Sequence, residues 1–172
     1  KTEHQQFTQL QIYRTGEYPC SYLPDRMAAS QMIAPIDRIN DSNYGQLLDM
    51  GFRRSGMYVY RPSCVDCHQC LSFRVVVEAF KPTRSQRRCQ KKWAHLKVRP
   101  MDLAFSEEHF ELYHRYVNAR HADGSMANDS KEQYQQFFLR SAITTALVEF
   151  RDEHNTLRMV SVIDQTHNGL SA

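Results

Sequence analysis

The sequence predicts an α+β protein with two domains, and three observations lead to this fold class. Short segments of alternating apolar residues, typical of strands, are mixed with segments that begin at helix-capping residues. The 172 residues are 41% hydrophobic, which is enough to form a core. A change of composition at Pro100 separates a basic stretch from a new series of helices and strands. We therefore expect one domain over residues 1–100 and another over residues 101–172.

The first domain combines expected strands with two expected helices. A helix over 42–50 should end at Gly51, because glycine readily adopts the left-handed conformation that closes a helix. A basic helix should run from about Ser85 to Leu96, before Pro100 breaks the chain. Strands are expected at 9–13, 57–61 and 71–80, the last from its alternating apolar residues, with a proline-bounded loop at 19–25.

The second domain should open with a helix that has Ser106 as its N-cap and runs to about Arg120. Its start is favoured by two acidic residues in the first turn, Glu107 and Glu108. It is also favoured by a hydrophobic staple between Phe105 and Phe110. After a loop over 120–126, a second helix should begin at a capping box.

The expected capping box of that helix pairs Asp129 with Glu132. Residues 143–150 and 157–164 then read as two strands of a hairpin, because a polar turn joins them. Another turn follows, and a third strand should begin at the last residues, "LSA". We therefore expect this second domain to be incomplete in the chain.

Three of the five cysteines, Cys64, Cys67 and Cys70, have the spacing C-x2-C-x2-C. This spacing lets one tight turn point three thiolates inward, as in the opening of the bacterial ferredoxin motif. Cys20, in its proline-flanked loop, is the best candidate for a fourth ligand, whereas Cys89 lies within the basic helix. Four such donors suit a zinc ion or an iron–sulfur cluster, and thiols without any metal are also common in cores.

Positive charge is concentrated in residues 81–99, which hold eight of the 22 Lys and Arg residues and no Asp or Glu. Five of these cations follow the spacing i, i+3, i+4, i+7, i+8 and share one helical face: Arg84, Arg87, Arg88, Lys91 and Lys92. Such a face suits the phosphates of a nucleic acid, although a solvated helix surface has the same composition.

Single polar residues give weaker indications. Arg53 and Arg54 lie in a segment bounded by glycines, where two arginines could bind a carboxylate or a phosphate, or simply belong to a turn. His121 and Asp123 follow the second-domain helix, and a loop histidine is a candidate base, although solvent-exposed histidines are more common. These two residues are the only catalytic candidates that the pattern offers.

No stretch approaches the roughly 20 consecutive apolar residues that span a bilayer. The polar first residues have no apolar segment of a secretory signal. We therefore expect a cytoplasmic protein that does not bind a membrane.

Four segments together resemble one family, and they occur in the family's order. They are "CSYLPD" (20–25), "GFRRSGMYVYRPSCVDCHQC" (51–70), "FKPTRSQRR" (80–88) and "RYVNARHADGSM" (115–126). The chain resembles the bacterial aminoacyl-tRNA–protein transferases of the aspartate/glutamate leucyltransferase type, which are related to arginyl-tRNA–protein transferases. The resemblance extends from about residue 9 to the end, and it implies a GNAT-like acyltransferase fold for the second domain, continued beyond Ala172.

The resemblance implies an enzyme that moves leucine from its tRNA to the α-amine of proteins beginning with Asp or Glu, which marks them for N-degron degradation. The expected partners are leucyl-tRNA and these acidic protein substrates, with no DNA. Arg53, Arg54 or Arg61 would bind the acidic side chain. The four cysteines at 20, 64, 67 and 70 match the family pattern. The chemistry requires no cofactor, because an aminoacyl ester is already activated.

Two other classes of protein remain open from the residues. A metal-stapled RNA-binding module without catalysis would need only the cysteines and the basic helix. A CoA-dependent acetyltransferase would need an R/Q-x-x-G-x-G/A loop, and the nearest match, from Arg53 to Tyr58, fails at its last position.

Overall fold

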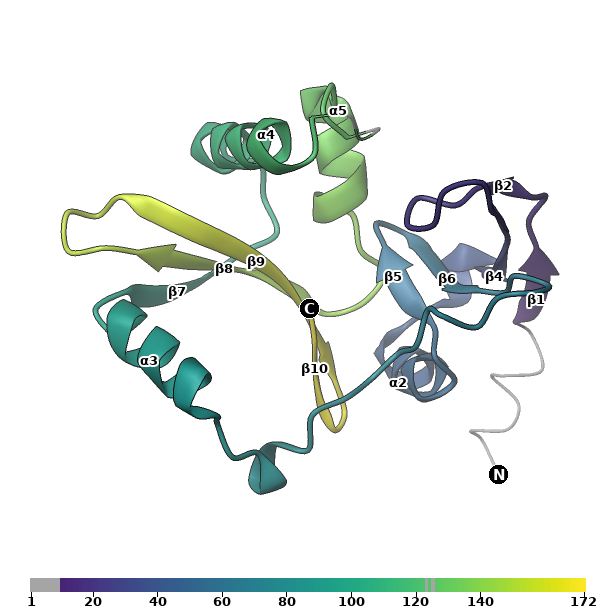
Figure 1. Cartoon of the computed structure of the whole chain (residues 1–172), viewed down its shortest axis with the longest axis horizontal. Coiled ribbons are helices and arrows are strands. Elements are labelled where there is room, and N and C mark those ends of the chain that lie inside the picture. The colour runs from purple at the N-terminus through teal and green to yellow at the C-terminus, as the bar shows by residue number, and fades with distance from the viewer. Residues whose placement is uncertain (1–9, 123, 125) are drawn as a thin grey trace. The chain divides into compact units, whose positions relative to one another are not determined.

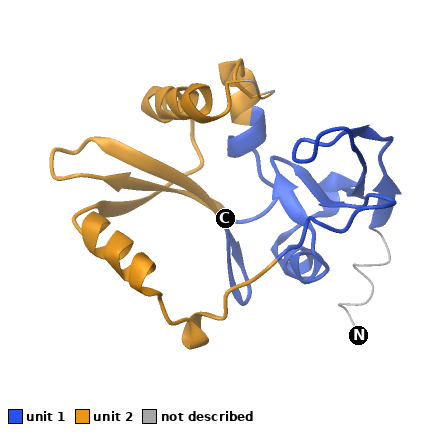
Figure 2. Ribbon diagram, viewed as in Figure 1, with its two compact units in different colours: residues 1–72, 136–144, 164–171 blue, residues 73–135, 145–163, 172 orange. Residues whose placement is uncertain are grey.

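The computed structural model describes residues 10–122, 124 and 126–172. Strands and helices form two compact units, so the predicted mixture of helices and strands is confirmed (Figures 1 and 2). Unit 1 comprises residues 1–72, 136–144 and 164–171, and unit 2 comprises 73–135, 145–163 and 172. This division differs from the expected boundary at residue 100, because local composition does not reveal contacts between segments that are distant in sequence.

Unit 1 is built on a four-stranded antiparallel sheet with the order β1-β4-β6-β5. Its strands are β1 (Gln11–Arg14), β4 (Ser30–Ala34), β5 (Arg53–Ser55) and β6 (Tyr58–Pro62). A separate two-stranded hairpin pairs β2 (Tyr18–Pro19) with β3 (Met27–Ala28). The strands expected at 9–13 and 57–61 form as β1 and β6, with residue 9 outside the described residues, and a loop runs from Cys20 to Arg26 as expected.

Helix α2 (Asp41–Asp49) follows a short 3-10 turn, η1 (Ile36–Arg38), in unit 1. Asn40 caps α2 with its side chain, and Gly51 closes the turn after it with a φ of 85°, as predicted. The core of unit 1 packs α2 on the sheet through Ile33, Ile39, Tyr44, Leu47, Phe52, Val59 and Ile143.

Gly56, in the turn between β5 and β6, also has a positive φ, of 57°. A Cβ atom here would lie 2.4 Å from the Gln136 carbonyl oxygen, so the position requires glycine for space as well as for conformation. The segment 136–144 thus packs closely on the β5–β6 turn within unit 1.

Unit 2 contains β7 (Lys97–Met101), β8 (Thr145–Arg151) and the first part of β9 (Leu157–Thr166), with β8 between the other two. The predicted hairpin of β8 and β9 is confirmed. Residues 164–166 of β9 belong to unit 1, where they pair with the third strand, β10 (Gly169–Ser171).

Pro100 lies inside β7, opposite Val148. β7 has the outermost place in its sheet, and proline is tolerated in an edge strand because no inward N–H is required of it there.

The helices of unit 2 are α3 (Arg84–Trp93), α4 (Glu107–Arg120) and α5 (Lys131–Tyr134), which continues into a π-helical segment, η3 (Gln135–Leu139). The staple of α4 forms, since the rings of Phe105 and Phe110 lie 6.3 Å apart. The capping box of α5 was placed one residue too early: Ser130 caps the helix with Gln133. Asp129 instead accepts a 2.6 Å hydrogen bond from the Tyr113 hydroxyl.

The predicted strand at 71–80 was wrong. This segment is extended chain with one 3-10 turn, η2 (Val77–Ala79). Its apolar side chains are exposed, with Leu71 at 81% and Phe73 at 90%. Alternation predicts a strand only where a neighbouring strand and a core face are available to that segment. Among the described residues, no helix is both long and apolar enough to cross a membrane.

Candidate functional site

Two loops of unit 1 border an open hollow of about 600 Å³, which we call the loop hollow. One loop joins β2 to β3, and the other follows β6. Both are fixed by backbone hydrogen bonds to residues that flank β3: the Cys20 N–H donates to the Arg26 carbonyl (2.8 Å), and the Ser63 N–H donates to the Ala29 carbonyl (2.7 Å). The hollow is lined by Leu23, Arg26, Asp66, Cys67, His68 and Gln69.

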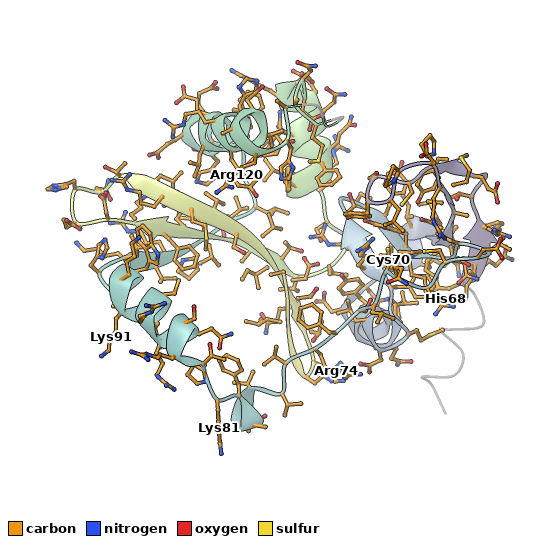
Figure 3. The ribbon with its side chains drawn as sticks, in the orientation of Figure 1. His68, Cys70, Arg74, Lys81, Lys91 and Arg120 are labelled. Carbon is orange, nitrogen blue, oxygen red and sulfur yellow. The ribbon has the colours of Figure 1, made fainter. Side chains whose placement is uncertain are left out.

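The cysteines predicted as ligands come from these two loops, and all are free thiols. Cys64 turns its sulfur toward the Ala29 carbonyl oxygen, 3.8 Å away, while Cys70 is exposed near His68 on the loop after β6 (Figure 3). Hydrogen bonds from the Tyr22 and Leu23 N–H groups hold the pKa of the Cys20 thiol below its ordinary value.

Within residues 10–122, 124 and 126–172, no three His, Cys, Asp or Glu side chains are grouped closely enough to hold a metal ion. The described conformation therefore does not assemble the predicted site of Cys20, Cys64, Cys67 and Cys70. A zinc ion or an iron–sulfur cluster at these cysteines stays a prediction from their spacing. Cys89, which was expected to lie outside the site, belongs to α3.

Arg54, one of the three arginines predicted to bind an acidic side chain, is occupied within unit 1. Its Nε lies 2.9 Å from Asp164 Oδ2 and its Nη2 lies 2.6 Å from Asp164 Oδ1. Both side chains are more than nine-tenths buried. Arg54 Nη1 also donates to the carbonyl oxygens of Gly56 and Arg140. Four of the five N–H donors of this guanidinium have partners within unit 1, so Arg54 chiefly holds the fold together.

Arg61 and Arg53 differ in how far their guanidinium groups are engaged by other residues. Arg61 donates to Gln31 Oε1 (2.7 Å) and to the Met50 carbonyl (2.6 Å), and its guanidinium lies 4.6 Å from the centre of the Phe52 ring. Arg53 is exposed, and its guanidinium lies 5.1 Å from the centre of the Tyr60 ring. Of the three arginines, Arg53 is the only one that is exposed.

The predicted basic helix forms as α3, and its start is fixed by a capping box between Thr83 and Gln86. The five cations that share one face are all exposed: Arg84, Arg87, Arg88, Lys91 and Lys92. Figure 3 shows Lys91 extending away from the ribbon. The acidic first turn that most helices favour is absent from α3, so no carboxylate of the helix neutralises this face.

The catalytic candidates of the sequence are weakly placed. His121 is the exposed residue at the C-terminal end of α4, and its ring lies 5.9 Å from that of Tyr116. Asp123 lies outside the described residues. His121 is therefore an accessible imidazole without a carboxylate shown to orient it.

A buried ionic network in unit 2 was missed by the sequence analysis. His109 Nε2 lies 2.7 Å from Glu149 Oε1, and Glu149 also accepts from Arg151 Nε (2.7 Å). Arg151 reaches on to both carboxylate oxygens of Glu108. The Arg151 hydrogen bonds lower the pKa of Glu149 to about 2, against the effect of burial. The alternation of Leu147, Glu149 and Arg151 on one face of β8 was the available signal, since two charges there must face inward together.

Comparison with known proteins gives two family matches that follow each other along the chain. Residues 18–88 match the N-terminal part of arginine-tRNA-protein transferase, and residues 108–172 match its C-terminal part. The two matched regions include the loop hollow and the first turn of α3 on one side, and α4, β8 and β9 on the other. They define the chain as an aminoacyl-tRNA–protein transferase in type.

Three bacterial relatives narrow this class further. The aspartate/glutamate leucyltransferase of Polynucleobacter necessarius is 48% identical over 170 residues, which are 96% of this chain and 68% of the relative. Those of Thiobacillus denitrificans and Chromobacterium violaceum are 48% and 43% identical, covering 96% and 97% of this chain and 69% of each relative. The chain belongs to the aspartate/glutamate leucyltransferase family, whose members are aminoacyltransferases.

Proposed function

We propose that the protein transfers leucine from leucyl-tRNA to the α-amine of proteins that begin with Asp or Glu. The observation that carries this proposal is the 48% identity over 96% of the chain to a relative named for that activity. The product would carry a leucine at its N-terminus and so enter N-degron degradation. Because aminoacyl-tRNA is made and used in the cytoplasm, we place the reaction there.

The proposed reaction is the aminolysis of an ester. The neutral α-amine of the acceptor attacks the carbonyl carbon of the leucyl ester, and a tetrahedral oxyanion forms. Its collapse makes the new C–N bond and breaks the C–O bond to the 3′-terminal ribose, so the tRNA leaves with a free hydroxyl. The amine loses one proton overall. The enzyme contributes chiefly by holding the two substrates at attack distance and by hydrogen bonds to the oxyanion.

The proposed tRNA-binding surface is the basic face of α3. Its five exposed cations lie on a helix that is capped and free of acidic residues, which supports contact with several phosphates of one backbone. Lys92 also lies 5.0 Å from the Trp93 ring, which places an aromatic surface beside the cations, where a base could stack.

The proposed acceptor site requires a cation for the acidic side chain. Arg54 and Arg61 are engaged by groups of unit 1. Of the three arginines predicted from the sequence, only Arg53 is exposed.

The test is transfer of labelled amino acid by the protein in its natural length. It is incubated with [³H]leucyl-tRNA or [³H]arginyl-tRNA and with peptides that begin with Asp, Glu, Lys or Ala. We expect label from leucyl-tRNA on the Asp and Glu peptides alone. Binding of tRNA without transfer to any acidic peptide, while a relative is active in the same assay, would identify an RNA-binding module instead.

A further inference from the structure

The loop hollow carries two opposite charges that are not paired with each other. Arg26 and Asp66 both line it, and among the described residues no ion pair joins them. Both side chains are exposed and come from different loops, Arg26 from the β2–β3 hairpin and Asp66 from the loop after β6. Two separated charges of opposite sign suit a ligand that itself carries both a cation and an anion.

The first residue of an acidic protein is such a ligand. Its α-amine has an ordinary pKa of about 7.7–8.0, so at neutral pH it is mostly an ammonium, and its side chain is a carboxylate. The two groups are separated by only a few bonds. We propose that the loop hollow binds this residue, with Arg26 paired to the side-chain carboxylate and Asp66 to the α-ammonium group, which loses a proton before the neutral amine attacks the ester. This inference rests on the proposed transferase function and assigns its acceptor site.

The construction of the hollow supports this assignment. Its volume of about 600 Å³ falls within the roughly 300–1,000 Å³ of small-ligand pockets and can take one residue with part of the next. Leu23 supplies an apolar wall for side-chain methylenes, while His68 and Gln69 supply polar groups for the acceptor backbone. A hydrogen bond from the Cys20 N–H to the Arg26 carbonyl closes the base of the first loop, and one from the Ser63 N–H to the Ala29 carbonyl fixes the start of the second beside β3, so both loops begin from hydrogen-bonded backbone.

The arginines outside the hollow explain why Arg26 is preferred. Arg54 and Arg61 use their guanidinium donors on groups of unit 1. Arg53 is accessible, but it does not line the hollow. Arg26 therefore combines an available guanidinium with an opposite charge across one concave surface, which is the arrangement that recognition of a dipolar residue requires.

The experiment is a set of two cycles, each pairing one protein variant with one peptide change. Peptides labelled at the C-terminus begin with Asp, with Asn, or with N-acetyl-Asp. Their binding to the natural-length protein is measured by fluorescence anisotropy in the presence of saturating deacylated tRNA, so that no transfer can occur. Arg26→Ala and Arg26→Gln should each weaken binding of the Asp peptide roughly tenfold or more, and binding of the Asn peptide by less than about twofold. Asp66→Asn should weaken the free Asp peptide but not its acetylated form.

The matched controls are Arg14→Ala and Asp37→Asn, which remove the same charges from exposed positions of unit 1 outside the hollow. Both should bind all three peptides like the unchanged protein. Arg53→Ala is the rival variant. If it, rather than Arg26→Ala, loses the preference for Asp over Asn, the hollow is not the acceptor site. The proposal is also overturned if the Arg26 variants weaken binding of the Asp and Asn peptides equally, or if they weaken binding of neither peptide.

Failure of the hollow and failure of the proposed function give different results. The second readout is the ratio of kcat/KM for transfer to Asp and Asn peptides. If the unchanged protein transfers leucine to acidic peptides and Arg26→Ala keeps that ratio, only the assignment of the hollow is wrong. If the unchanged protein transfers nothing to acidic peptides, the proposed function itself fails, and the assignment fails with it.

Discussion

At the scale of single residues, the sequence made Arg54 a candidate for binding substrate. The structure instead places its side chain in a buried ion pair with Asp164. The two residues are 110 positions apart, and Tyr44 adds its hydroxyl to Asp164 at 3.3 Å. Burial and the nearby Asp164 charge raise the pKa of Tyr44. No local pattern around "GFRRSG" distinguishes Arg54 from Arg53, because the distinction depends on which one meets a distant carboxylate.

Arg54→Ala should destabilise unit 1 by about 3–5 kcal/mol, because it leaves the Asp164 carboxylate buried without its counter-charge. The measurement is amide hydrogen exchange of α2 and β6. The neighbouring variant Arg53→Ala, at an exposed position, should cost about 1 kcal/mol or less. The double variant Arg54→Ala, Asp164→Ala should cost less than the sum of the two single variants. A purely additive result would show that the pair is not coupled.

Glu149 predicts an acid-dependent loss of stability in unit 2. Its pKa is lowered from 4.5 to about 2, so its ionised form stabilises the fold fully above about pH 4.5 and loses this effect as the pH falls toward 2. The shift corresponds to roughly 3 kcal/mol. The Glu149→Gln variant should therefore have a lower free energy of unfolding than the unchanged protein at pH 7. Its free energy of unfolding should also fall much less between pH 5 and 2, as measured by urea unfolding at each pH. Glu111→Gln, at an exposed position of α4, should keep the full decline.

At the scale of elements, the sequence predicted best those that local signals determine. Gly51, the Phe105–Phe110 staple and the basic face of α3 each depend on neighbours within a few residues, and all were placed correctly. The segment 71–80 has the same quality of pattern, but a strand also requires a distant partner strand, which alternation cannot supply. The candidate site followed the same division: the sequence identified the cysteine loops, yet it missed Arg26 and Asp66, which only the pairing of β2 with β3 and the anchor at Ala29 bring to one hollow.

The basic face of α3 makes a second prediction at this scale. Single replacements of Arg84, Arg88 or Lys91 by Ala should weaken tRNA binding by similar factors for different tRNAs, because phosphate contacts carry no sequence information. Each should also reduce the magnitude of the slope of log K against log salt by roughly 0.7–0.9. Fluorescence anisotropy across a salt series measures both. Lys97→Ala, a cation on β7 outside α3, is the matched control. An unchanged slope in the α3 variants would mean that tRNA binds elsewhere.

At the scale of the whole molecule, the charge distribution and the chemistry lead to one arrangement of substrates. The helix with the unbalanced cations belongs to unit 2 and the loop hollow to unit 1, so each unit offers a surface for one of the two proposed substrates. Two separate substrate surfaces suit a reaction in which both substrates are bound together. A single shared surface would instead suit a mechanism in which leucine is first transferred to the enzyme as a covalent intermediate.

The transfer should therefore proceed without a covalent leucyl-enzyme, although five free thiols are present. A thiol nucleophile requires an adjacent base, and among the described residues none of the cysteines is hydrogen-bonded to a histidine; Cys64 contacts only the Ala29 carbonyl in this way. The leucyl ester is also activated enough to react with an amine directly.

The natural-length protein is incubated with [³H]leucyl-tRNA without acceptor, treated with ribonuclease and precipitated with acid; we expect no label on the protein. Initial rates with both substrates varied should give intersecting rather than parallel double-reciprocal lines. Label that survives ribonuclease and is released by hydroxylamine would instead demonstrate a leucyl thioester, and the Cys20→Ser variant would then be the first to examine, because the Tyr22 and Leu23 N–H groups favour its thiolate.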